Sequence, residues 1–180
     1  MKLEAHRIVA EWLRDATYGY AAKLAALSLD GSDARPTTIA SASIVSAADD
    51  HNAAFLRFDG MTLPALIVSV VGEVEYLDPN QPQTSDREDA NLTVQVRYAE
   101  KNTNAKAAVA NSDYAIRAVR ASLRELHKDS NAASRTRNSV RLVACEGLVE
   151  QSAFEQVDDT WLLAAIQPRY YVSNLLPLGA

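Results

Sequence analysis

The chain has one cysteine, six glycines and three histidines among its 180 residues, and each shortage argues against a class of protein. Cys145 cannot form an internal disulfide, and in an apolar segment we expect a buried, unreactive thiol. The scattered glycines match neither a phosphate-binding loop nor a dinucleotide fingerprint. His6, His51 and His127 lack the spacing of metal ligands, so we expect surface or helix-end positions and no metal or other cofactor.

Basic residues and long apolar runs are also scarce. The formal net charge is −5 and the sequence pI is about 5.2, which disfavours tight nucleic-acid binding because phosphate contacts need clustered Lys and Arg. No apolar run approaches the ~18 residues that span a bilayer, and residues 1–6 lack the apolar core of a signal peptide. We therefore expect a chain that is made in the cytoplasm and does not contact a membrane.

A catalytic constellation is missing as well. General acid/base chemistry needs two carboxylates in a pocket that perturbs their pKa values, whereas the acidic residues at 86–89 lie in a polar, solvated segment. No serine lies in a nucleophile elbow. The sequence therefore predicts a protein that is not an enzyme. The alternatives from other classes are a small enzyme or ligand-binding domain with a cleft between sheet and helices, and a nucleic-acid-binding module.

What the chain does contain is a set of amphipathic helical segments. Apolar residues near helical spacing predict an N-terminal helix: Leu3, Val9, Trp12 and Leu13. Good helix formers at residues 21–27 allow either a second helix or one kinked helix. A further apolar stripe, with steps of three, four and three, predicts a central helix over residues 113–127: Ile116, Val119, Leu123 and Leu126. This helix begins either near residue 113 or already within residues 103–110.

Several other segments have the patterns of β-strands. Residues 63–76 include an apolar, β-branched run, and residues 91–100 alternate between apolar and polar side chains. Residues 140–150 and 160–172 indicate a final strand pair, and the small side chains of residues 37–52 suggest another strand. The sequence thus predicts a single α+β domain over residues 1–180, with a mixed, largely antiparallel sheet flanked by the N-terminal helices and one long central helix.

Two polar connections are the candidate partner-contact surfaces. Residues 78–90 form a long predicted loop, and residues 127–138 lead into a cationic segment. In a ring of identical subunits, surfaces of opposite charge could form the two halves of a head-to-tail contact. The candidate interface residues are Asp86, Arg87, Glu88, Asp89, Arg135, Arg137 and Arg141. The apolar tail at residues 173–180 is expected to be docked or disordered.

The order of these elements resembles a known family. The N-terminal helix at residues 7–14, the strand at 63–68, the helix at 114–120 and the closing strand at 161–171 are similar to tail terminator proteins of long-tailed bacteriophages. The resemblance covers most of the chain in element order and consists of packing patterns. It implies a mixed sheet flanked by helices, in subunits that assemble as a hexameric ring.

The resemblance also implies a function. Such a ring caps the tail tube, stops its polymerisation and joins the tail to the head connector, while DNA passes through the lumen without specific binding. The implied partners are copies of the same chain, the tail tube protein and a head connector or neck protein. The implied location is the tail or neck of the virion, after assembly in the host cytoplasm. Within the same class, the alternative is another neck or tail-completion protein.

Overall fold

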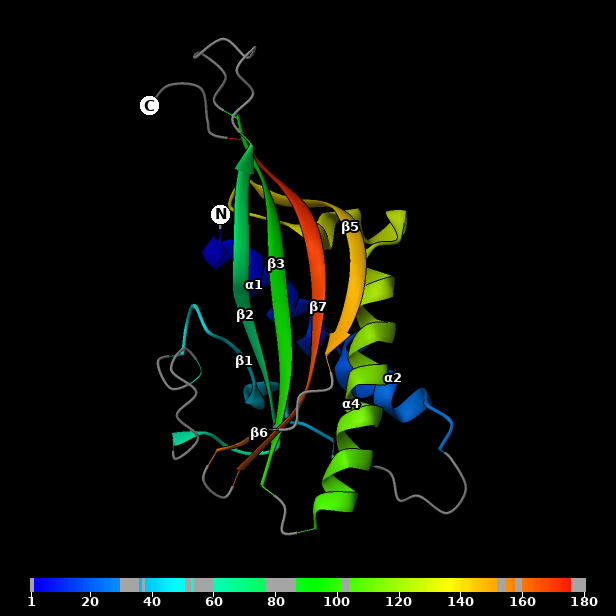
Figure 1. Ribbon diagram of the computed structural model, residues 1–180. Coiled ribbons are helices and arrows are strands. Elements are labelled where there is room, and N and C mark those ends of the chain that lie inside the picture. The colour runs from blue at the N-terminus through cyan, green and yellow to red at the C-terminus, as the bar shows by residue number, and fades with distance from the viewer. Residues whose placement is uncertain are drawn as a thin grey trace.

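Long strands of one sheet organise the molecule (Figure 1). A computed structural model describes residues 2–29, 36, 38–50, 53, 60–76, 87–101, 104–151, 155–157 and 160–175. Within these residues, seven strands form one sheet in the order β1-β2-β3-β7-β5-β4, with β6 paired to β7. β1 runs parallel to β2, and the other described pairs are antiparallel. The chain therefore has the predicted α+β fold with a mixed, largely antiparallel sheet.

The elements have the following bounds. The strands are β1 (Ile44–Ser46), β2 (Ala65–Tyr76), β3 (Arg87–Glu100), β4 (Thr136–Arg137), β5 (Val140–Gln151), β6 (Glu155–Val157) and β7 (Thr160–Leu175). The helices are α1 (Lys2–Arg14), α2 (Tyr20–Ala26) and α4 (Ala105–Leu126), with short 3₁₀ segments η1 (Ser41–Ser43) and η3 (Asp129–Arg135). Figure 1 shows β2, β3 and β7 side by side, with α1 behind them. Among the described residues, none of the helices is long and apolar enough to cross a membrane.

The core lies between the helices and one face of the sheet. Four alternating side chains of β3 are at most 1% exposed and belong to this core: Leu92, Val94, Val96 and Tyr98. The predicted apolar stripe of α4 packs into the same cluster, together with Trp12 and Leu13 of α1. The period of two in the strand and the period of about 3.6 in the helix thus select the side chains that meet.

The start of α4 is set by a capping residue. Asn104 is the N-cap, and its side-chain oxygen accepts a hydrogen bond from the backbone N–H of Ala107 at 3.2 Å. An asparagine cap satisfies one of the amide groups that have no partner in the first helical turn. The helix therefore begins at Ala105, the earlier of the two positions that the sequence allowed, and extends over 22 residues.

α1 and α2 are separate helices joined by a tight corner. The carboxylate of Asp15 accepts hydrogen bonds from the backbone N–H groups of Thr17 and Tyr18, at 2.8 and 2.7 Å. Gly19 follows, and a Cβ atom at this position would lie only 2.3 Å from the backbone oxygen of Asp15. Trp12 stacks on Tyr18 with ring centroids 5.6 Å apart. The corner therefore requires a residue without a side chain at position 19.

The strand expected in residues 37–52 is much shorter than the pattern suggested. Of the described residues 38–50, Ile44–Ser46 form β1, which is preceded by the 3₁₀ segment η1 and pairs with β2 in parallel. The strand ends because the carbonyl of Ser46 accepts hydrogen bonds from the N–H groups of Asp49 and Asp50, which closes a turn. Small side chains were compatible with a strand but did not define its length.

The polar connections are also more ordered than their composition indicates. β3 begins at Arg87, so the predicted loop over residues 78–90 ends earlier, and β7 continues through residues 173–175 of the expected tail. Pairing with neighbouring strands explains both extensions, since Arg87 pairs with Leu175 and Asp89 pairs with Tyr76. Residues 129–137 form η3 and β4 rather than an irregular connection. Residues 77–86 and 176–180 lie outside the described part of the chain.

Candidate interaction surface

Five of the predicted interface residues lie at one end of the sheet: Arg87, Glu88, Asp89, Arg137 and Arg141. Strand register places Asp89 opposite Ser173 of β7, and Ser173 opposite Arg141 of β5. Neighbouring strands lie about 4.8 Å apart, so the backbones at 89 and 141 are separated by roughly 10 Å. The two predicted patches, about fifty residues apart in the sequence, are therefore neighbours on one subunit. They do not lie on opposite sides of it, as a simple head-to-tail charge contact would require.

The adjacent row of backbone positions extends this region to the edge of the sheet. Glu88 pairs with Asn174, Asn174 with Val140, and Val140 with Arg137 of β4. We name this region the sheet end and define it by the backbone positions 76, 87–89, 136–137, 140–141 and 173–175. Figure 1 shows β2, β3 and β7 converging toward it at the top of the view.

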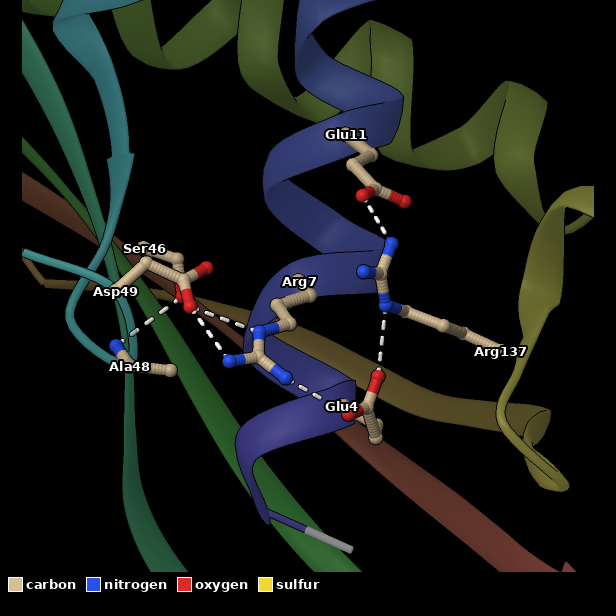
Figure 2. Close-up of polar contacts among 7 residues, drawn as sticks. All are labelled: Glu4, Arg7, Glu11, Ser46, Ala48, Asp49 and Arg137. Atoms are coloured by element: carbon tan, nitrogen blue, oxygen red, sulfur yellow. Dashed lines mark hydrogen bonds and ion pairs between the residues drawn. The ribbon is translucent and has the colours of Figure 1, made fainter.

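An ion-pair network connects the sheet end to α1 (Figure 2). Glu4, Arg7 and Glu11 follow one another at helical spacing and form a polar stripe on α1. The guanidinium of Arg137 lies between the two glutamates, with Nε 2.8 Å from Glu4 Oε2 and Nη1 in contact with Glu11 Oε1. The edge strand β4 is therefore attached to α1 through Arg137.

The same helix holds the opposite edge of the sheet. Arg7 Nε and Nη2 donate to Asp49 Oδ1 at 2.9 and 2.6 Å, and Nη1 donates to Glu4 Oε1 at 2.9 Å. Asp49 lies in the turn after β1, where the Ser46 hydroxyl accepts from the N–H of Ala48 (Figure 2). Because β1 and β4 are the two ends of the strand order, the sheet must curve around α1.

The charges of this network are stabilised by their own contacts. The hydrogen bond from Arg7 lowers the pKa of Asp49 against the opposing effect of burial. For Glu4, burial raises the pKa, but hydrogen bonds from Asn138 and Arg7 and the charges of Arg7 and Arg137 lower it overall. The hydrogen bond to Asp49 raises the pKa of Arg7 in turn. These groups therefore stay ionised around neutral pH, and the network remains intact there.

The three predicted cations have three different environments. Arg137 is engaged within the chain, as described above. Arg135 is only 6% exposed, and its Nε has no hydrogen-bond partner among the described residues, so it is not the surface contact that the sequence predicted. Arg141 is exposed on β5 and remains suitable for a partner contact. Burial of Arg135 follows from the 3₁₀ segment η3, whose course the sequence pattern did not indicate.

The backbone positions of the acidic half of the predicted interface are known from β3. Arg87, Glu88 and Asp89 are the first residues of β3, within the sheet end. Asp86 lies outside the described residues.

On α4, Arg117 forms an ion pair with Asp113 at 2.8 Å and lies over the Tyr114 ring, so this arginine is occupied within its own helix.

His6 has a role that the sequence reading missed. It is only 8% exposed, and its Nε2 accepts a hydrogen bond from the backbone N–H of Val70 in β2 at 2.7 Å. The ring is therefore neutral with its proton on Nδ1, and the expectation of a surface position was wrong. Burial lowers its pKa, Arg7 adds to this, and Asp49 opposes it. The helical step from His6 to Val9 and Leu13 could have indicated a buried position.

His127 does lie at a helix end, as the C-cap of α4. Its ring packs against Tyr170 with centroids 5.3 Å apart, and burial together with Arg135 lowers its pKa. A favourable cation at the helix C-terminus is therefore not the reason for its position. His51 lies outside the described residues.

The sheet end presents charged side chains and the backbone of strand edges. Within the described ranges, no group of three or more His, Cys, Asp and Glu side chains is arranged to hold a metal ion. A scan against protein-family models and a search of curated proteins found no match to this chain. The arrangement at the sheet end offers backbone edges and an exposed Arg141 for contact with another protein.

Proposed function

We propose that this chain is a structural virion protein, a phage tail terminator whose identical subunits form a ring on the end of the tail tube. The observation that carries the proposal is the order of the elements and their packing. α1, β2, α4 and β7 occupy the segments whose sequences resemble the family, and the helices cover one face of a largely antiparallel sheet.

The lengths of the strands support an assembly role. β3 has 14 residues and β7 has 16, whereas strands in globular proteins usually have about five or six. Long paired strands form a rigid body that can transmit contacts between ring neighbours. Ion pairs connect α1 to the turn after β1 and to β4, near the two edges of the sheet.

In this role the ring ends tube polymerisation and provides the surface to which the head connector or neck protein docks. DNA then passes through the lumen. A chain with a net charge of −5 suits a lumen through which a polyanion must slide without being held. The sheet end, with Arg141 exposed, is the surface that we assign to contact with one of these partners.

The proposal is tested with the full chain and cognate tail tubes. Light scattering should show a mass that is a multiple of the subunit mass, and electron micrographs should show the protein at one end of each tube. Arg141→Glu should reduce occupancy of tube ends or ring formation, while the matched control Arg124→Glu, an exposed arginine of α4, should leave both unchanged.

Two outcomes would contradict the proposal. A strict monomer that never associates with tube ends would exclude a terminator ring. Binding at the head portal instead of the tube end would identify the chain as a neck protein rather than a terminator.

A further inference from the structure

The sheet has two outer edges, and each is covered over only part of its length. β1 pairs with Leu66, Ile67 and Val68 of the 12-residue β2, and His6 then accepts the N–H of Val70. On the other side, β4 pairs only with Val140 and Arg141 of the 12-residue β5. Among the described residues, no strand pairs with the outer edge of β2 beyond Val70 or with that of β5 beyond Arg141.

The two open edges lie at the same level of the sheet. Register connects Gly72 to Thr93, Thr93 to Arg169 and Arg169 to Gly147. Three positions further along β2, Glu75 connects through Ala90 and Val172 to Leu142 in the same way. The open segments 72–75 of β2 and 142–147 of β5 therefore lie at the same height along the strands, on opposite edges of the sheet.

The directions of these strands are complementary. β2 is antiparallel to β3, β3 to β7 and β7 to β5, so β2 and β5 run in opposite directions. A rotation about an axis parallel to the strands keeps every strand direction. β2 of one copy would therefore meet β5 of the next copy antiparallel, which is the pairing found inside each subunit.

Each open edge begins with an exposed apolar residue. Val71 is 48% exposed and Val143 is 38% exposed, and each lies at a register shift just beyond the covered part of its strand. A bulge on an edge strand discourages pairing, but proteins that keep an edge free usually also protect it with charged residues, proline or a covering segment. The open segments do contain acidic residues, Glu73 and Glu75 in β2 and Glu146 in β5, while Val71 and Val143 expose apolar side chains that a paired strand would cover.

We propose that the open edge of β2 in one copy of this chain pairs antiparallel with the open edge of β5 in a second copy, so that the sheet continues from subunit to subunit. The inference rests on the ring function proposed above and names the contact that builds the ring. A second copy is the partner because every subunit carries both complementary edges at one level. Identical copies in a closed ring therefore pair the open segments of both β2 and β5, whereas one added peptide would leave one of them open.

The experiment compares three exposed valines in the full chain. Val71→Lys and Val143→Lys place a charge on the two open edges, and Val109→Lys is the matched control on the solvent side of α4, where the valine is 43% exposed. Each edge variant should raise the concentration at half assembly at least tenfold, while the control should change it less than twofold. Circular dichroism and the urea midpoint should show that all three variants fold.

Amide hydrogen exchange of the wild-type chain provides a second readout that needs no variant. On assembly, those amides of residues 72–75 and 142–147 that point away from β3 and β7 should exchange at least tenfold more slowly, while those on the exposed face of α4 should not change. Rings that form equally well from both edge variants, with edge amides that stay unprotected, would overturn the edge pairing but leave the terminator function intact. A chain that is monomeric at every concentration and does not bind tube ends would overturn both.

Discussion

The two faces of the sheet differ in how completely they are covered. On the side of the helices, Leu92 and Val94 of β3 are fully buried within a continuous core. On the opposite side of the same strand, Thr93 and Arg97 are only partly buried. The apolar cluster on that side is small and lies near β1: Ala53, Ile67 and Ala99, with Val45, Met61 and Leu63 against it.

This difference separates the parts of the molecule by role. Burial of apolar side chains is the main source of folding free energy, so the helix-covered face determines stability. The opposite face and the open edges contribute less, and they are the places where partner contacts cost the fold little. Variants in adjacent residues of one strand can test this separation directly.

The largest effect is expected from Leu92→Ala. Removing a fully buried leucine side chain leaves a cavity and should lower the free energy of unfolding by about 2–5 kcal/mol. Thr93→Ala, one residue further on the opposite face, should change it by no more than about 0.5 kcal/mol. Urea unfolding of both variants measures the contrast, and similar losses would show that the two faces contribute equally.

A second comparison uses two glycines, one in the helix corner and one on the open edge. In Gly19→Ala the new Cβ would lie 2.3 Å from a backbone oxygen, so we expect a loss of about 1–3 kcal/mol. In Gly72→Ala it would meet Thr93 at 3.7 Å, an ordinary contact, and stability should be unchanged or slightly higher. Thermal unfolding would contradict this if Gly72→Ala were the more damaging variant.

An intermediate effect is expected from pH, through the histidines on the helix-covered side. Burial lowers the pKa of both His6 and His127 in the folded chain. Below about pH 6.5 the unfolded chain therefore binds more protons, so stability should fall as the pH drops from 7 toward 5. The double variant His6→Gln, His127→Gln should flatten this slope, since glutamine at position 6 can still accept the Val70 N–H.

The urea midpoint as a function of pH measures the slope. Glu4 and Asp49 have lowered pKa values, so their contribution is lost only at more acidic pH, below the ordinary range of carboxyl groups. The pH range in which the histidines affect stability is therefore separate from that of Glu4 and Asp49. A double variant that keeps the full slope between pH 7 and 5 would show that other groups are responsible.

The smallest effect is expected from Asp49→Asn, which breaks the ion pair between α1 and the turn after β1. The Arg7 and Asp49 side chains are 28% and 49% exposed, and exposed pairs contribute little because water and salt screen them. The urea midpoint should shift less than in any variant above, and 1 M salt should remove the difference. A shift as large as that of Leu92→Ala would mean that the network, not the core, holds the curved sheet.

Much of the fold was predictable because its elements have clear local periods. The apolar stripes anticipated α1 and α4, and the alternation of β3 identified four of its buried side chains, although Gln95 on the other face is buried as well. The short strands could not be found in this way, because the three residues of β1 and the two of β4 are too few to show a repeated alternation. They are strands only because a neighbouring strand lies beside them.

The sequence named candidate interface residues but could not indicate how they are arranged. The sequence singled out Arg137 and Arg141 for their charge, and both do lie at the sheet end. It could not show that Arg137 is already bound by Glu4 and Glu11, which lie more than a hundred residues earlier. It also could not show that Arg135 is buried.

The sequence by itself determined the fold class, the main helices and strands, and the division of β3 into an apolar and a polar face. Each of these depends on side chains a few residues apart. Only the tertiary structure decided which distant segments meet: acidic and basic residues at one sheet end, α1 between both edges, and two open edges at the same level. These depend on strand register and chain path, which follow from the packing of the whole core rather than from any local pattern.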